Sequence, residues 1–152
     1  MGSRLRILNS KQVKQLQQKL NEQFGIPIKK LPYVFLESTK GKFFITNRKL
    51  AEIDINKIKV NNLGLYVAAE DKLGVRLTIE GSQLWGKEAT KNILEINQEQ
   101  LQEWFTGKEL QTNQVFNGFV LIKHKKDFLG SGKYTQGRIL NYLGKERYVK
   151  FK

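Results

Sequence analysis

The chain has 152 residues, of which 39% are hydrophobic and 11% aromatic, so it can form a packed core in one ordinary domain or two very small ones. Its net charge of +13 favours nucleic acid or an anionic membrane surface as a partner. No apolar run approaches the roughly 18–20 residues of a membrane span. Because no secretory leader is evident, the cytoplasm is the expected compartment. Cysteine is absent and His124 is the only histidine, which excludes disulfides, thiol nucleophiles and Cys/His zinc sites, so we expect no metal and no cofactor.

The first predicted element is a helix that begins at Ser10, as N-cap, and ends at Gly25. Apolar residues at spacings of three and four predict its core face, which consists of Val13, Leu16, Leu20 and Phe24. The opposite face carries Lys11, Lys14 and Lys19. A basic amphipathic helix can lie on an anionic membrane, but this polar face is rich in Gln, so packing on a core is the favoured interpretation.

Two hairpins are predicted next. The first joins strands at 33–37 and 42–46, and the second joins strands at 57–69 and 73–79. A short helix is expected at 48–53. The region 81–89 is ambiguous and could hold a short helix with Trp85, which we interpret as inter-domain packing rather than as a stacking platform for bases.

A second domain is predicted to begin near Asn92, which divides the chain into domains 1–90 and 91–152. A strand at 93–96 precedes a helix that Asn97 caps and Gly107 ends. Its core side is predicted to be Leu101, Trp104 and Phe105. Further strands are expected at 119–123, 128–132 and 147–151. The fold class is therefore α+β, with a small N-terminal α/β domain.

Positive charge is concentrated in residues 117–152, where nine Lys and Arg stand against two acidic residues, a net of +7. Strand-like apolar runs and tyrosines alternate with these charges. Basic side chains on a β scaffold, with aromatic rings beside them, are typical of proteins that bind the RNA backbone and its accessible bases. The sequence therefore predicts an RNA-binding protein.

Residues 92–151 resemble a PUA domain, a small pseudo-barrel that binds RNA. The likeness is closest to the PUA-like module of RsmF and Nop/Sun type RNA methyltransferases. The segments that carry it are Trp104-Phe105-Thr106-Gly107-Lys108, Gly118-Phe119-Val120, Leu129-Gly130-Ser131-Gly132-Lys133, Gly137-Arg138-Ile139-Leu140-Asn141 and Gly144-Lys145-Glu146-Arg147, in which Gly144 replaces the usual proline. The resemblance implies a C-terminal PUA-type β pseudo-barrel.

The layout of the whole chain is similar to that of the Nip-seven family of ribosome-biogenesis factors. Two short segments, Asn62-Leu63-Gly64-Leu65 and Val75-Arg76-Leu77-Thr78-Ile79, resemble the pattern that precedes the PUA domain in that family. No residue roles follow from this weaker likeness.

The Gly130-Ser131-Gly132-Lys133 segment is not a nucleotide P-loop, because Asp127 and Tyr134 occupy the positions of its first glycine and its Ser or Thr. We predict instead a tight strand-to-loop turn whose backbone can approach RNA. The candidate RNA-binding residues are Lys123, Lys125, Lys126, Gly130, Gly132, Lys133, Tyr134, Arg138, Lys145 and Arg147.

Other candidates have a more ordinary explanation. Arg48, Lys49 and Arg76 come from the first domain, where ordinary surface charge is the commoner explanation. Tyr142 could stack on a base but is expected to pack on the barrel.

The favoured function is a non-catalytic RNA-binding protein that acts on rRNA or tRNA in processing, modification or ribosome assembly. An adaptor for RNA-processing or ribosome-assembly proteins is the alternative. An RNA-modifying enzyme is less favoured, because the chain has no nucleophilic Cys and no Gly-rich turn for S-adenosylmethionine, and Glu37, Glu80 and Asp71 have no predicted catalytic partner. Reversing Lys125, Lys126 and Arg147 to Glu is expected to abolish binding without unfolding.

Overall fold

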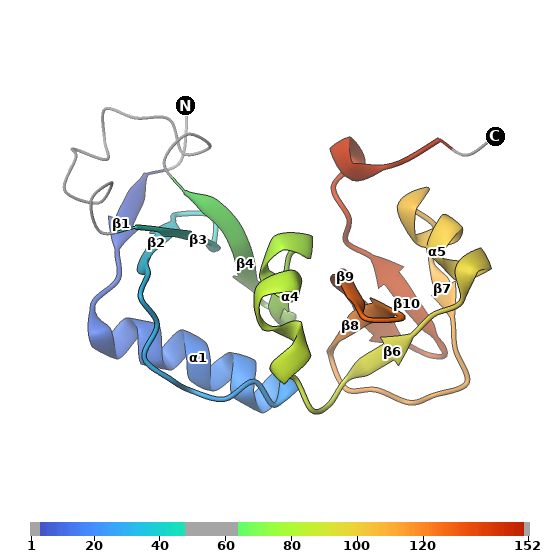
Figure 1. The fold of residues 1–152 in the computed structure, drawn as a ribbon, viewed down its shortest axis with the longest axis horizontal. Coiled ribbons are helices and arrows are strands. Elements are labelled where there is room, and N and C mark those ends of the chain that lie inside the picture. Colours follow the sequence, from blue (N-terminus) through green and yellow to red (C-terminus); the bar gives the residue numbers. More distant parts are fainter. Residues whose placement is uncertain (1–3, 48–63, 151–152) are drawn as a thin grey trace.

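Two five-stranded sheets lie side by side in the computed structural model, which describes residues 4–47 and 64–150 (Figure 1). The α+β class is therefore confirmed. The first sheet is an antiparallel meander in which each strand pairs with the next one along the chain. Its strands are β1 (Leu5–Ile7), β2 (Val34–Ser38), β3 (Lys42–Thr46), β4 (Leu65–Asp71) and β5 (Gly74–Leu77).

Both predicted hairpins are present in this first sheet, whereas β1 was not predicted. Within the described residues the strand expected at 57–69 begins at Leu65. The helix expected at 48–53 lies outside the described residues, as do Arg48 and Lys49.

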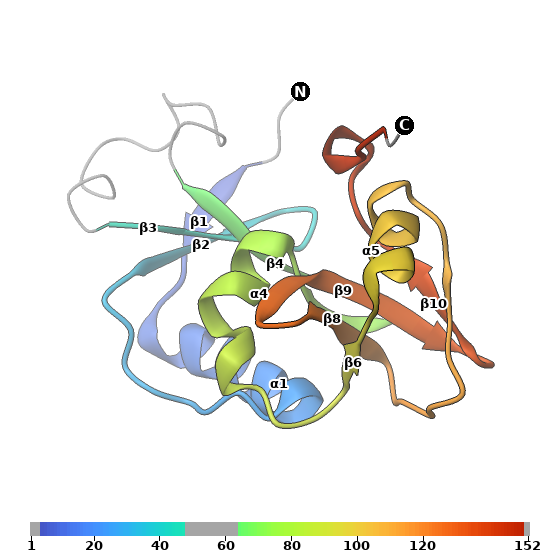
Figure 2. The ribbon, with the colours of Figure 1, turned by 45° about the vertical axis from the view of Figure 1, so that its right-hand side comes forward.

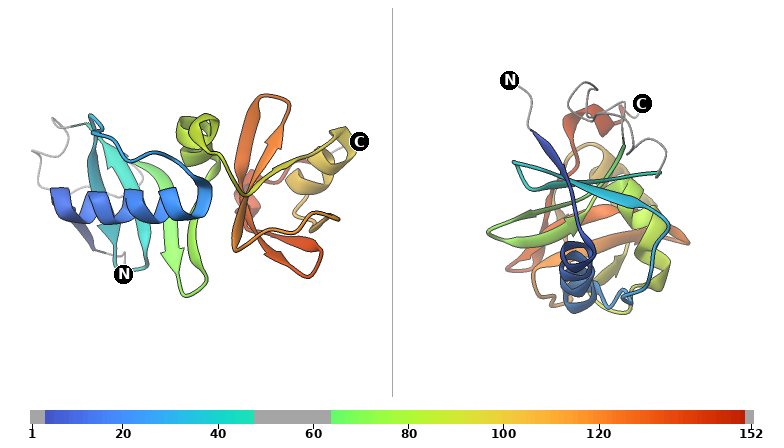
Figure 3. Two further views of the ribbon diagram at one scale, coloured as in Figure 1. Left: turned by 90° about the horizontal axis from the view of Figure 1, so that it is seen from below. Right: turned by 90° about the vertical axis from the view of Figure 1, so that its left-hand side faces the viewer.

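The helix α1 (Ser10–Phe24) crosses one face of the first sheet (Figure 3). Its N-cap is Asn9 and not Ser10, because the Asn9 side chain accepts from the Gln12 backbone and the Gln12 side chain accepts from Asn9, as in a capping box. Gly25 ends the helix in the left-handed conformation, with φ 74°. The predicted core face is confirmed, since Leu16, Leu20 and Phe24 are buried. None of the described helices is long and apolar enough to span a membrane.

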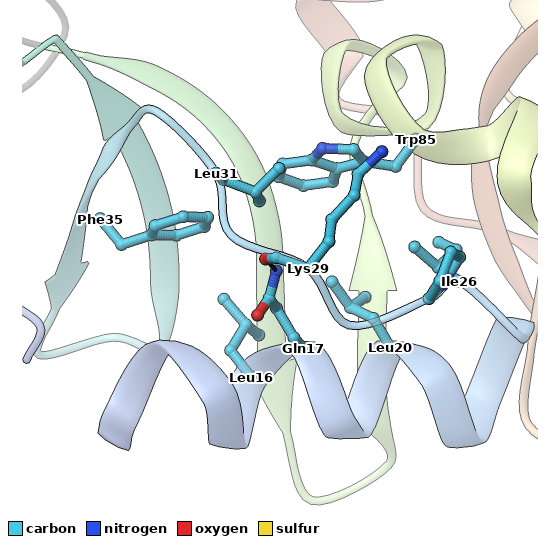
Figure 4. A pocket seen from close by; sticks show the side chains of 9 residues that line it. Leu16, Gln17, Leu20, Ile26, Lys29, Leu31, Phe35 and Trp85 are labelled. Atoms are coloured by element: carbon cyan, nitrogen blue, oxygen red, sulfur yellow. Dashed lines mark hydrogen bonds between the residues drawn. The ribbon is translucent and has the colours of Figure 1, made fainter. Parts of the chain in front are cut away.

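Trp85 belongs to the core that α1 and the first sheet enclose. It ends the short helix α4 (Ile79–Trp85), which the 3-10 turn η2 (Gly86–Glu88) follows. Figure 4 shows its indole above α1, and its ring stacks on Phe35 with the centroids 6.3 Å apart. The cavity beside it measures about 10 Å³, room for no more than one water. The inter-domain packing predicted for Trp85 agrees with its buried cluster, which also contains Leu121 and Phe128 of the second sheet. Its neighbour Gly86 lies against the ring of Phe128.

The second sheet contains, in spatial order, β6 (Ile93–Glu95), β8 (Phe119–His124), β9 (Asp127–Thr135), β10 (Arg138–Asn141) and β7 (Leu110–Gln111). In this sheet β6 is parallel to β8 and the other pairs are antiparallel (Figure 2). The helix α5 (Gln98–Phe105) packs on it and begins with a second capping box, formed by Asn97 and Gln100. Trp104 is completely buried, and Leu101 and Phe105 pack on the same cluster, which confirms the predicted core side.

The strand predicted at 147–151 is wrong for residues 147–150, and residue 151 lies outside the described residues. Residues Lys145–Arg147 form the 3-10 turn η3, and 148–150 have no regular structure. The backbone N–H of Val149 donates to the carbonyl of Phe105 at 2.7 Å. This segment therefore packs against the end of α5 instead of joining the sheet.

The turn predicted at Gly130-Ser131-Gly132-Lys133 is also wrong, because these residues lie inside β9 and the first three are buried. The Gly130 N–H donates to the Ser82 hydroxyl of α4 at 2.9 Å. A side chain at Gly132 would overlap the carbonyl of Leu140. Gly132 thus permits the close approach of the neighbouring strand, whereas Gly130 is required by its positive φ of 90°.

One hydrophobic cluster extends across both sheets, and a separate cluster belongs to the second sheet alone. We call residues 4–90 the first-sheet unit and residues 91–150 the second-sheet unit. Phe24 and Leu77 of the first unit belong to the same buried cluster as Phe119 and Leu121 of the second. The side-chain amide of Gln23 also donates to two second-unit carbonyls, those of Asn117 at 2.6 Å and Phe119 at 2.7 Å. The division of the chain into domains 1–90 and 91–152 stays a prediction.

Candidate nucleic-acid interface

The turn between β8 and β9 presents two exposed lysines. Lys125 adopts a positive φ of 55° and its backbone N–H donates to the carboxylate of Glu95 at 3.1 Å. Lys126 completes the two-residue turn. Within the described residues neither ammonium group has a carboxylate partner, so both are available to neutralise phosphate.

Three other predicted residues use their side chains partly for packing. The Lys123 ammonium lies 5.5 Å from the ring centroid of Phe128, and the Lys133 ammonium lies 5.4 Å from that of Phe119. Tyr134 packs edge-on against Phe116 at 5.9 Å. Because neighbouring residues of a strand point to opposite faces, Lys133 and Tyr134 do not form one binding surface.

Both predicted arginines are held by carboxylates. Arg138 pairs with Glu109 at 3.4 Å, and Arg147 pairs with Glu80 of α4. Lys145 is exposed, and its ammonium has no carboxylate partner in the part of the chain that the structure describes. Reversing Arg147 to Glu would place two carboxylates together, so it is unsuitable as a test of RNA binding alone.

The ten predicted residues therefore do not form one patch. The free lysines of the β8–β9 turn lie beside α4, whereas η3 with Lys145 lies apart from them, near the C-terminal end (Figure 2). Gly130 and Gly132 are buried. Among the ten predicted residues, the exposed ammonium groups without a carboxylate partner in the described residues are those of Lys125, Lys126 and Lys145.

Arg76 is the one described candidate from the first unit, and it reaches the second. Its guanidinium carbon lies 4.8 Å from the ring centroid of Tyr142 and 5.8 Å from that of Phe119. One nitrogen, Nη1, donates to Asp71 at 3.0 Å. Tyr142 packs edge-on against Phe119 at 5.2 Å, so its predicted packing role is confirmed.

A cleft of about 370 Å³ opens beside Arg76, between the two units. Lys42 and Tyr66 line it from the first sheet and were not predicted as site residues. In the sequence both residues appear as ordinary strand positions. Only the approach of the second sheet turns that strand surface into the wall of a cleft, so no local pattern indicates them.

Comparison with known proteins decides what the second-sheet unit is. Residues 91–148 match the family model described as the methyltransferase RsmF PUA domain. The C-terminal domain is a PUA domain of the RsmF type. The resemblance predicted from the glycine and Trp104-Phe105 segments is thereby confirmed.

Relatives named ribosomal RNA small subunit methyltransferase F match more of the chain. The protein of Vibrio cholerae serotype O1 (strain M66-2) is 24% identical over 137 residues, which cover 90% of this chain and 28% of the relative. The protein of Aeromonas salmonicida (strain A449) is 28% identical over 91 residues, which cover 59% of this chain and 19% of the relative. The chain thus spans 19% to 28% of the length of these two relatives. The layout shared with Nip-seven factors stays a prediction.

Proposed function

We propose that this protein is a non-catalytic RNA-binding protein whose PUA domain binds structured ribosomal RNA or tRNA, in rRNA processing, modification or ribosome assembly. The observation that carries the proposal is the pair of lysines Lys125 and Lys126 at the exposed β8–β9 turn of a PUA domain, whose ammonium groups have no carboxylate partner among the described residues. Ribosomal RNA is favoured because the relatives bear the name of a small-subunit rRNA methyltransferase.

The non-catalytic part of the proposal rests on side-chain chemistry. The 152 residues contain no Cys to act as a nucleophile. Glu80, one of the acids considered for proton transfer, already pairs with Arg147. Asp71 pairs with Arg76 at 3.0 Å, and Glu37 pairs with Arg6 at 2.6 Å. These carboxylates serve ion pairs, so we assign binding and not turnover to this chain.

Phosphate contacts through the turn lysines are expected to dominate affinity. The test compares fluorescent small-subunit rRNA stem-loops, tRNA and matched duplex DNA over a range of salt concentrations. The variant Lys125→Asn with Lys126→Gln removes two charges, and Asn tolerates the positive φ of position 125. The control Lys11→Gln with Lys14→Gln removes two exposed charges from α1.

We expect the turn variant to bind RNA roughly tenfold or more weakly, with the salt slope reduced by about two phosphate contacts. The α1 control should retain most of the affinity. If both variants weaken binding equally, or if RNA and DNA bind equally and modest salt abolishes both, the positive charge acts only as a general field. A protein partner in an RNA-processing complex then becomes the better proposal.

A further inference from the structure

The cleft between the two units is a concave surface that carries charge, and no residue of the β8–β9 turn lines it. Residues of β3, β4, β5 and the start of α4 form its first wall. Gly130 and Ser131 of β9, together with the segment that follows β10, form its second wall. Its volume of about 370 Å³ lies near the lower end of the range for small-ligand sites.

Cations and aromatic rings alternate across this cleft. The Lys42 ammonium lies 5.3 Å from the ring centroid of Tyr66. Arg76, which follows across the sheet, lies over the ring of Tyr142 in the second unit at 4.8 Å. The series Lys42, Tyr66, Arg76 and Tyr142 therefore runs from one unit to the other. Such an arrangement can bind a nucleotide, because a cation can contact the phosphate while an aromatic ring stacks on the base.

The charges of the cleft are only partly neutralised. Arg147 is occupied by Glu80, and Arg76 uses Nη1 for Asp71. Lys42 is exposed, and among the described residues it has no carboxylate partner. The unneutralised positive charge thus lies at Lys42, while Arg76 has N–H donors besides the Nη1 that it gives to Asp71. Glu146, which also lines the cleft, would repel a longer run of phosphates. This balance suits one phosphate and not an extended backbone.

We propose that this cleft binds a single phosphate of an unpaired RNA segment, with its nucleoside against Tyr66 and Tyr142. The proposal rests on the proposed RNA-binding function and adds a second contact, in which the first-sheet unit participates. A base in a duplex can enter the cleft only after its base pair breaks, which costs free energy. The cleft therefore gives this protein a preference for single-stranded or bulged RNA over blunt duplex.

Hexauridylate is the probe, because it has unpaired bases and a short backbone. Lys42→Gln removes the exposed cation of the cleft. Lys40→Gln is the matched control, since Lys40 is an exposed lysine of the same hairpin that does not line the cleft. We expect the first variant to lose about tenfold in hexauridylate affinity, and the control to bind as the parent does. Amide chemical shifts of the labelled parent should move at Lys42, Tyr66, Arg76 and Tyr142.

Arg76→Lys provides a second test that keeps the charge but loses the planar group. We expect it to weaken hexauridylate binding and to leave binding of a blunt RNA duplex unchanged. If Lys42→Gln and Lys40→Gln bind hexauridylate equally well, while Lys125→Asn with Lys126→Gln loses rRNA binding, the cleft proposal is overturned and the proposed function stands. If the parent binds neither hexauridylate nor the rRNA stem-loop, both are overturned.

Discussion

The hydroxyl of Ser131, in the PUA domain, forms two hydrogen bonds with the backbone of Leu77 in the first-sheet unit. It accepts from the Leu77 N–H at 3.0 Å and donates to the Leu77 carbonyl at 2.8 Å. Ser131 is only 4% exposed. The Ser131 side chain thus supplies hydrogen-bond partners to the backbone at the end of β5. That strand is the edge of its sheet, so no further strand of the first sheet could supply them. Because Leu77 and Ser131 line opposite walls of the cleft, these two hydrogen bonds hold the walls together.

Ser131→Ala should lower the free energy of unfolding by about 1–3 kcal/mol, because it leaves a buried N–H and a buried carbonyl without partners. Urea unfolding monitored by tryptophan fluorescence measures the change. Ser10→Ala is the control, since Ser10 is exposed, and it should change stability by no more than about 0.5 kcal/mol. Equal stability of the Ser131 variant and the parent would contradict this role.

Trp104→Phe should destabilise the protein by about 2–4 kcal/mol. Trp104 is completely buried, and its Nε1 donates to the carbonyl of Leu129 at 2.8 Å. The substitution leaves a cavity and an unpaired carbonyl, while Trp85 remains as a fluorescent reporter. Val115→Ala, at a position that is 84% exposed, is the matched control in the same guanidinium titration. A loss no greater than that of the control would show that the core adapts to the smaller ring.

Gln136→Asn should stabilise the protein by roughly 0.5–1 kcal/mol. Gln136 and Gly137 form the turn between β9 and β10, with φ values of 45° and 82°. Both residues have positive φ, as a type I′ turn requires, and Asn-Gly is the preferred pair for such turns. Thermal unfolding measures the gain.

The opposite change in the same turn is Gly137→Ala. A methyl group there would meet only the Thr112 carbonyl, at an ordinary 3.6 Å, so its cost of about 1 kcal/mol is purely conformational. A gain from both Gln136→Asn and Gly137→Ala would contradict the turn geometry.

Stability should fall at alkaline pH through Tyr66. Burial raises the pKa of its phenol above the ordinary 10.0, and the charge of Arg76 acts in the opposite direction. Below pH 10 the phenol is neutral in both the folded and the unfolded chain. As the pH rises further, the unfolded chain ionises first, so stability is lost until the folded phenol ionises as well.

Tyr66→Phe should therefore reduce the loss of stability between about pH 9 and 11. The measurement is the free energy of unfolding of parent and variant across this range, together with phenolate absorbance. Tyr33→Phe is the control, since Tyr33 does not line the cleft. An absorbance difference between parent and Tyr66→Phe that titrates below pH 10 would contradict the predicted direction.

Local patterns of the chain determine much of the fold. The spacing of Leu16, Leu20 and Phe24 places one face of α1 on a core, and Asn97 and Trp104 do the same for α5, because helix periodicity and capping depend on residues three or four positions apart. The PUA resemblance is carried in the same way by short segments. Such features need no knowledge of distant residues.

The sequence by itself thus determined the two helices, the hairpins, the PUA domain and the excess of positive charge. Only the tertiary structure decided which charges remain free. Arg147 is neutralised by Glu80, which lies 67 positions earlier in the chain. Arg76 of the first-sheet unit lies over the ring of Tyr142 in the second-sheet unit. Gly130 and Gly132, which resemble a turn, lie inside β9, where Gly130 is needed for its positive φ and Gly132 for close packing. Burial and ion pairing depend on partners distant in the chain, and no local pattern contains them.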